Sequence, residues 1–261
     1  MNLALAVRPN RVVSPAVLRW LGLAWLLCLF AAWTTTSFDV LPTPREVVRA
    51  FAPLVRDHRL LPNLFASLRA NVTAMMIATF LSLGLAYASV VPALRPVAAF
   101  VGKTRFWGFT GVTVLFTLLF SGGHQLKIAL LVFGITGFYL TAMRDEVEAI
   151  PEEKFDYART LGMSEARVVW EVIVRGTLDK AFDAFRQNAA MGWMLLTMVE
   201  TLVRSEGGVG VLLANQNKHM NLASVVALQS VIFAVGIGQD YLIGVIKNLA
   251  CPHAQLMVAR R

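Results

Sequence analysis

Long, uninterrupted apolar runs are the feature that most restricts how this chain can fold. The runs are Ala16–Thr35, Ala70–Val91, Phe106–Phe120, Leu126–Met143, Ala189–Val203 and Leu222–Ile246. A helix rises about 1.5 Å per residue, so about 20 residues cross a hydrocarbon core roughly 30 Å thick. A soluble core needs no such set of runs, and their residues do not alternate as those of a membrane β-barrel do. We therefore predict an all-α fold, a polytopic membrane bundle of about six transmembrane helices.

Composition agrees with a membrane protein and excludes several other classes. The chain is 57% hydrophobic and 15% charged, whereas soluble domains carry about 25% charged residues. Its net charge of +8 would suit nucleic acid, but the lysines and arginines lie in short segments beside apolar runs, where membrane topology places them. Cys28 and Cys251 have no CxxC partner, and the histidines form no ligand cluster. We expect no metal, no cofactor and no nucleic-acid partner.

The basic residues also predict an orientation. With the N-terminus in the cytoplasm, sixteen of the 24 lysines and arginines lie in inner segments and eight in outer ones, as the positive-inside rule requires. Residues 1–15 and the tail 249–261 are then cytoplasmic and flank a transmembrane domain over 16–248. The first run also has the charged start of a cleavable signal peptide. It is longer than a usual signal core, so we favour an uncleaved first helix.

Two predicted runs are short, and two outer segments have a pattern of their own. Phe106–Phe120 and Ala189–Val203 fall short of a full span, and the second spans the membrane only if polar residues before it are included in the helix.

The outer segment LPTPREVVRAFAPLVRDHRLL predicts an amphipathic helix that begins near Pro44. Its apolar face consists of Val47, Val48, Phe51 and Leu54. This helix is either a solvated surface helix or a contact for a secreted binding protein. A later outer segment predicts a tight or re-entrant loop at Gly207, Gly208 and Gly210.

The longest predicted inner loop, Arg144–Asn188, contains a helix, a glycine turn and a second helix. Its segment 151–178 begins with Pro151 and two acidic residues, which favour a helix N-terminus. Gly162 stops the first helix, since glycine adopts a left-handed conformation at little cost, and Ser164 caps the next. Apolar residues recur at helical spacing: Phe155, Ala158, Leu161, Val168, Val169, Val172 and Ile173. A loop that acted only as a tether would not need this apolar ridge.

This segment resembles the EAA loop of the permeases of binding-protein-dependent ABC importers. The pattern of that loop is E-A-A, three residues, G, nine residues, I, one residue, L-P. The residues that fall on it in register are Asp156, Tyr157, Ala158, Gly162, Val172 and Val174. Arg175 stands in place of the terminal proline, where Gly176 offers a bend instead. The stretches LPTPREVVRAF and VETLVRSEGGVGVLLANQ resemble elements of the nitrate, sulfonate and taurine branch, and the resemblance covers roughly residues 38–248.

The resemblance implies a location in a bacterial inner membrane, a mechanism and a set of partners. In such permeases the EAA loop is a coupling helix that docks on a cytoplasmic ABC ATPase, and closure of two ATPase subunits switches the bundle from inward-facing to outward-facing. The implied partners are the ATPase subunits, a second permease copy in a homodimer or heterodimer, and a periplasmic solute-binding protein. The residues on the pattern would then contact the ATPase or set the geometry of the loop, although Gly162 also suits an ordinary helix stop. The solute is not legible from the sequence.

Polar residues inside the apolar runs are candidates for the translocation pathway, since such groups are costly in a membrane. These residues are Thr197, Glu200, Gln229 and Ser230. Glu200 could line the pathway, hydrogen-bond between helices or extend to the interface, and the two residues of the last run could face a cavity or bond to another helix. Asp240 should be solvated or paired with Lys247.

The chain contains no GxxxxGK[ST] sequence, so ATP hydrolysis is expected on a separate subunit and the chain itself is not expected to be an enzyme. Two other classes compete with an importer permease. A secondary transporter would favour an inverted repeat, and none is evident. A membrane enzyme or scaffold is expected to have ionisable residues that converge at one depth of the membrane, and the apolar runs show no such set. We predict the permease subunit of an ABC importer.

Overall fold

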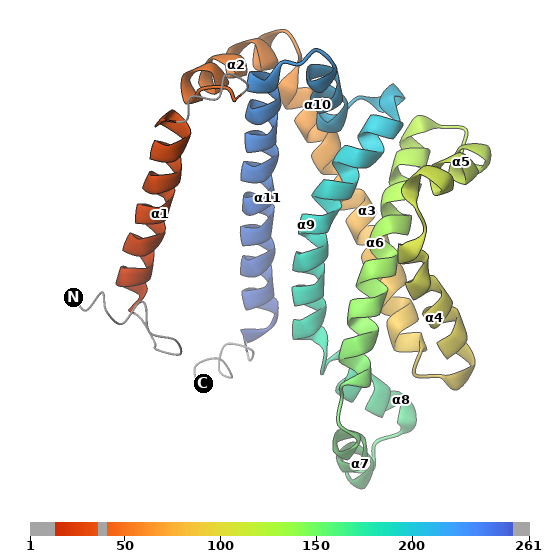
Figure 1. The fold of residues 1–261 in the computed structure, drawn as a ribbon. Helices are drawn as coiled ribbons and strands as arrows, with labels where there is room; N and C mark the ends of the chain where they lie inside the picture. The colour runs from red at the N-terminus through yellow and green to blue at the C-terminus, as the bar shows by residue number, and fades with distance from the viewer. Residues whose placement is uncertain (1–13, 36–40, 253–261) are drawn as a thin grey trace.

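The computed structural model describes residues 14–35 and 41–252, and this part of the chain is a bundle of helices without strands (Figure 1). Within it, four helices are long and apolar enough to cross a membrane. These helices are α1 (Pro15–Thr35), α3 (Leu60–Ala88), α6 (Gly123–Glu148) and α11 (Leu222–Ala250). The predicted all-α membrane bundle is confirmed, and four of the predicted runs become these helices.

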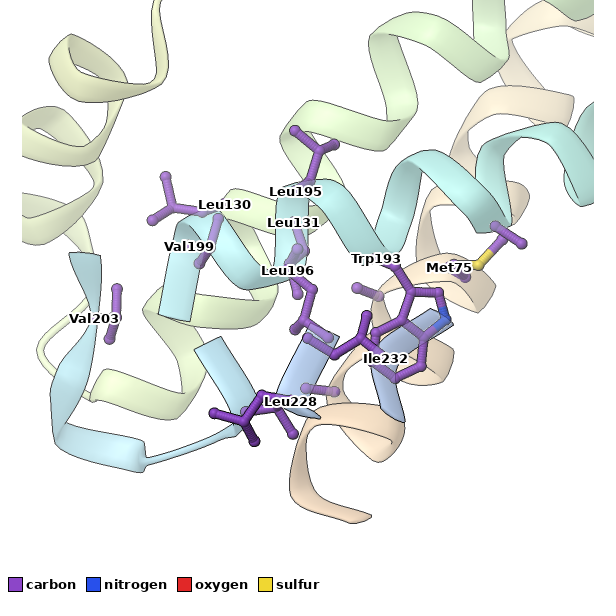
Figure 2. Close-up of a cluster of buried hydrophobic side chains, with 14 of the residues drawn as sticks. Met75, Leu130, Leu131, Trp193, Leu195, Leu196, Val199, Val203, Leu228 and Ile232 are labelled. Carbon is purple, nitrogen blue, oxygen red and sulfur yellow. The ribbon is translucent and has the colours of Figure 1, made fainter. Parts of the chain in front are cut away.

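The centre of the bundle is formed by α3, α6 and α9 (Leu178–Leu202), and α11 lies beside α9 (Figure 1). Leu131 of α6, Leu196 of α9 and Leu228 of α11 are fully buried in one continuous core (Figure 2). Lipid tails are as apolar as these side chains, so helices in a membrane associate through close packing rather than through the hydrophobic effect. The core therefore fixes which helices are neighbours.

The third predicted span, Phe106–Phe120, corresponds to one shorter helix, α5 (Phe109–Leu119). A 3-10 turn (Thr104–Phe106) separates α5 from α4 (Arg95–Lys103), so the chain is broken just before this span. With 11 residues, α5 is about 16 Å long, roughly half of a hydrocarbon core. Glycines of α6 make room for the broken segment, because a Cβ on Gly134 would lie 2.5 Å from the Phe109 ring and one on Gly137 would lie 3.1 Å from Arg105. The apolar run began at this break, but the preceding helix α4 was not predicted from the sequence.

The fifth predicted span began too late. We expected Ala189–Val203, but α9 begins at Leu178, and the polar stretch before Ala189 forms its first three turns. Charged residues lie on these turns: Asp179, Lys180, Asp183 and Arg186. At the other side of the loop, α6 continues past Met143 to Glu148. The predicted loop between the two spans is therefore shorter, and residues 149–177 connect α6 to α9.

The two ends of the bundle carry different short elements (Figure 1). We call the end with α7 (Glu152–Thr160) and α8 (Glu165–Val168) the hairpin end. The opposite end carries α2 (Pro44–Arg56), a 3-10 turn (Arg204–Glu206) and α10 (Val209–Lys218). Between α3 and α4, a further 3-10 turn covers Pro92–Leu94. The predicted amphipathic α2 is present, with Thr43 and Glu46 in a capping box. Its buried face consists of Val47, Ala50 and Leu54, whereas Val48 is exposed, contrary to the prediction.

The first helix stands apart from the bundle (Figure 1). None of the side chains in its most apolar window is buried. Trp33, near its end, donates a hydrogen bond of 3.1 Å from Nε1 to the backbone oxygen of Pro42 at the start of the next segment. An apolar helix of this length with an exposed surface suits lipid or another membrane helix as its surroundings.

Candidate functional site: the hairpin and the membrane groove

A glycine turn joins the two helices of the hairpin, which we define as residues 151–177. Gly162 has a φ of +74°, in the left-handed region that glycine adopts without strain. The amide of Gly162 donates to the carbonyl of Arg159 at 2.9 Å, and that of Met163 to the carbonyl of Ala158 at 3.3 Å. This pair of bonds is the Schellman arrangement, which satisfies the last carbonyls of a helix. The predicted glycine stop is therefore present with its hydrogen bonds.

An arginine ties the two hairpin helices together across this turn. Arg159 of α7 donates from Nε to Oε1 of Glu165 in α8 at 3.0 Å, and from Nη1 to Oδ1 of Asp156 at 3.2 Å. The hydrogen bond from Arg159 lowers the pKa of the Glu165 carboxyl below its usual value, so the pair is charged at neutral pH. Ser164 takes the N-cap position of α8 as predicted, but its side chain makes no capping bond.

The hairpin encloses a hollow of about 580 Å³ between α7 and a π-helical segment, Val169–Val174. Three of the residues on the EAA pattern line it, namely Tyr157, Ala158 and Val172. Ala158 is buried, but Tyr157 and Leu161 are 67% and 58% exposed. Asp156 lies outside the hollow in its ion pair, and Val174 is half-buried without lining it. The hairpin thus presents an open, partly apolar hollow beyond the end of the bundle.

The exit of the hairpin depends on a second glycine. The amide of Arg175 donates to the carbonyl of Trp170 at 2.9 Å, a bond five residues back that belongs to the π-helical segment. A Cβ on Gly176 would lie 2.1 Å from the carbonyl oxygen of Val172, so only glycine fits this approach. The chain then turns through Thr177 into α9. The predicted bend at Gly176 is present, and it replaces the terminal proline of the pattern.

A groove of about 760 Å³ runs between α9 and α11. Its walls are mostly apolar, and its polar side chains include Gln229, Ser230 and Asp240 of α11. Two of the four predicted pathway residues therefore face this groove. Thr197 does not line it, and its hydroxyl donates to the carbonyl of Met194 one turn earlier at 2.9 Å.

Glu200, the remaining pathway candidate, is fully buried in a network of charged and polar groups, which we call the buried network. Its Oε1 lies 3.1 Å from Nζ of Lys127, whose side chain is 2% exposed, and accepts a bond of 2.7 Å from the Ser67 hydroxyl. Its Oε2 accepts from the amide of Gly210 at 2.7 Å. Of the three roles considered for Glu200, the structure shows hydrogen bonding between helices.

The buried network also fixes the glycine loop that follows α9. Gly207 and Gly208 have φ of +65° and +121°, as a tight loop at these glycines requires. The amides of Gly208 and Val209 donate to Asn63 Oδ1 and Ser67 Oγ, both at 2.9 Å. Lys127 Nζ donates to the carbonyl of Gly207 at 3.0 Å. Side chains of α3 and α9 thus accept from the amides at the start of α10, which have no partner within the helix. Lys127 of α6 holds the carbonyl just before them.

The ion pairs at the hairpin end differ from the predicted pairing. Asp240 was expected to be solvated or paired with Lys247, but it pairs with Arg186 of α9. Lys247 pairs instead with Asp183 of α9. The prediction failed because these residues of α9 were assigned to a loop rather than to a helix that faces α11.

Sequence reasoning also missed Lys127 and Gln239. Lys127 is one of the eight basic residues assigned above to outer segments, but it is the second residue of the apolar run Leu126–Met143, a position at which a cation can be buried. Gln239 Oε1 accepts from Trp193 Nε1 at 2.7 Å and from Asn71 Nδ2 at 3.5 Å, so it joins α3, α9 and α11. A glutamine within an apolar run is a polar group that membrane helices use to associate.

Comparison with known proteins identifies a family of membrane proteins to which this chain is similar. The chain matches, over residues 5–246, the family described as binding-protein-dependent transport system inner membrane component. It is 23% identical over 225 residues to the taurine transport system permease protein TauC of Escherichia coli (strain K12), a match that covers 79% of this chain and 80% of that protein. The predicted resemblance to the nitrate, sulfonate and taurine branch is confirmed. This chain belongs to the family of inner membrane components of binding-protein-dependent transport systems.

Proposed function

We propose that this chain is the permease subunit of an ATP-binding cassette importer, in which the hairpin docks on a separate cytoplasmic ATPase. The observation that carries the proposal is the hairpin itself. Its helices are held by the Schellman turn at Gly162 and by the Arg159–Glu165 ion pair. Its hollow is open and partly apolar, and its helices α7 and α8 lie beyond the end of the bundle (Figure 1). A stiff connector with an exposed apolar contact transmits a displacement that a flexible loop would absorb.

Each residue on the EAA pattern has a part in this proposal. Tyr157, Ala158 and Val172 line the hollow that would receive a side chain of the ATPase. Asp156 holds Arg159 and so stiffens the turn, while Gly162 sets the angle between the helices. Val174 lies at the end of the π-helical segment, next to the bend into α9.

The groove between α9 and α11 is our candidate for part of the translocation pathway. Gln229 and Ser230 offer an amide and a hydroxyl to a small polar solute, and neither side chain is buried. We do not extend the pathway to Thr197 or Glu200, because the first lies outside the groove and the second is fully buried. A second permease copy, identical or different, would cover the open side of the groove.

Orientation and solute follow from the same assignment. The hairpin end would face the cytoplasm, with both termini on that side of the inner membrane, and the opposite end would meet a periplasmic solute-binding protein. The distribution of basic residues supports this orientation. The similarity to a taurine transport permease supports a small solute of the taurine, sulfonate or nitrate kind, and ATP hydrolysis on a partner subunit fits the lack of a GxxxxGK[ST] sequence.

Replacing Leu161 by aspartate tests the docking role. A carboxylate in the hollow must lose its water when an apolar partner side chain enters, which costs at least about 1.4 kcal/mol and therefore about tenfold in affinity. We expect the ATPase subunits to bind the Leu161→Asp permease at least about tenfold more weakly, as measured by titration in detergent or nanodiscs.

The matched control is Ala166→Asp, which adds the same charge to an exposed position of α8 outside the hollow. This variant should bind the ATPase subunits as the unmodified chain does. Equal binding by all three proteins would show that the hollow takes no part in docking.

A further inference from the structure

Two ion pairs cross from α9 to α11 at the hairpin end of the bundle. Arg186 donates from both Nε and Nη2 to the two carboxylate oxygens of Asp240. Lys247 Nζ donates to Asp183 Oδ1 at 2.5 Å. The helices run in opposite directions (Figure 1). Residues three apart on α9 and seven apart on α11 lie on one face of their helix. Both ion pairs therefore lie where the two helices face each other.

These ion pairs lie where α11 has few buried side chains. Among the described residues of α11 beyond Ile232, Ile243 is the one that is buried. Asp240 also lines the groove between the helices. Gln239 adds an uncharged tie to Trp193 of α9. In the hairpin half of α11, these polar contacts to α9 therefore add to the apolar packing of Val235 and Ile243.

The same part of α9 is directly connected to the hairpin. Arg175, Gly176 and Thr177 alone separate the π-helical segment from α9. The Thr177 hydroxyl donates to the carbonyl of Ile173 at 2.8 Å, so the junction is bonded back to the hairpin. Further along α9, the carbonyl of Ala181 accepts a bond of 3.0 Å from the Tyr139 hydroxyl, so this turn is also bonded to α6. A displacement of the hairpin thus reaches the first turns of α9, where Asp183 and Arg186 lie.

We propose that Arg186, Asp240, Asp183 and Lys247 are positioning residues that make the hairpin half of α11 follow α9 when the hairpin moves. This inference rests on the proposed coupling role of the hairpin. An exposed ion pair contributes little to stability. A bidentate arginine–carboxylate pair such as Arg186–Asp240 fixes geometry as well. Together with the Lys247–Asp183 pair, it resists sliding and separation of the helices. The pairs would keep both walls of the groove together while the permease changes state.

Distance measurements between spin labels on α9 and α11 test this inference. With Cys28 and Cys251 replaced by serine, labels are placed at the exposed positions Lys180 and Asn248. The labelled copy is mixed with an excess of unlabelled copies and assembled with the ATPase subunits. The separation is measured without nucleotide and after trapping with ATP and vanadate. We expect the same narrow distribution in both states for the unmodified ion pairs.

Charge variants provide the decisive comparison. Asp240→Arg places like charges opposite each other, so we expect a second, longer separation after trapping. The exchanged variant, Arg186→Asp with Asp240→Arg, should restore the single distribution. Glu148→Arg is the matched control, because it reverses a charge in an ion pair within α6 that does not connect α9 to α11, and it should change nothing.

Two outcomes would overturn the inference. The first is a separation that already changes on trapping in the unmodified chain, and the second is a single distribution that persists in Asp240→Arg. A spin label at Tyr157 of the hairpin distinguishes a wrong positioning role for the ion pairs from a wrong coupling role for the hairpin. If the distance between hairpin labels in a complex of two labelled copies does not respond to trapping, the coupling role is wrong. If it responds while α11 fails to follow α9, only the positioning role is wrong.

Discussion

Replacing Lys127 by methionine is expected to lower the free energy of unfolding by about 3–5 kcal/mol, because the Glu200 carboxylate then stays buried without its counter-charge. The two side chains are 2% and 0% exposed, and their charged atoms lie 3.1 Å apart. The hydroxyl of Ser67 and the amide of Gly210 would still donate to the carboxylate, but neither supplies a positive charge. Denaturant unfolding of the permease in detergent micelles, followed by tryptophan fluorescence, measures the loss.

A second substitution separates the buried charge from the loss of a side chain. In Lys127→Met with Glu200→Gln, the glutamine still accepts a hydrogen bond but carries no charge, so most of the lost stability should return. Arg144→Met is the matched control, since it removes the cation of an ion pair whose acid, Glu148, is 64% exposed, and it should cost less than about 1 kcal/mol. Equal destabilisation of the single and double variants would show that the unpaired charge is not the cause.

Replacing Gly162 by proline is expected to leave the protein inserted in the membrane but to reduce the solute transported per ATP by about tenfold or more. A tenfold loss corresponds to about 1.4 kcal/mol of the free energy that couples the hairpin to the ATPase. Proline holds φ near −65°, whereas Gly162 has +74°. Proline also lacks the amide that donates to the carbonyl of Arg159 at 2.9 Å. The turn must then open, and the hollow loses its shape. Uptake and ATP hydrolysis measured together in proteoliposomes with the ATPase subunits and the binding protein check this ratio.

Gly162→Asn is the control for this experiment. Asparagine adopts the left-handed region more readily than other residues with a side chain, so the turn and the coupling ratio should be largely kept. Normal uptake by the proline variant would count directly against a coupling role for the hairpin. A loss of equal size in both variants would point to the side chain at this position rather than to the turn.

Much of the fold was predictable because its causes are local. The long helices follow from apolar runs that only a membrane accommodates, and the turn at Gly162 follows from a glycine placed where the helical spacing stops. The capping box at Thr43 and Glu46 is also a short-range pattern. Each of these features depends on residues within a few positions of one another, so the sequence contains the necessary information.

The remaining features depend on contacts between distant residues. Lys127 and Glu200 are 73 positions apart, and only the packing of α6 against α9 shows that they form a buried pair. The break before α5 fits because Gly134 of the neighbouring helix makes room for Phe109. Arg186 belonged to a polar stretch that resembled a loop, and its role became clear only when that stretch proved to be helical and to face Asp240 of α11. Polar residues in a membrane bundle are placed by their partners, which the local pattern does not specify.

The most direct test of the account is the side of the membrane on which the hairpin lies, and what covers it there. In a chain with Cys28 and Cys251 replaced by serine, Tyr157→Cys provides a thiol at a position that is 67% exposed. A membrane-impermeant maleimide should label this thiol in inside-out vesicles and not in right-side-out vesicles, and binding of the ATPase subunits should protect it. Labelling from the outside, or labelling that is unchanged when the ATPase subunits are bound, would contradict the central claim.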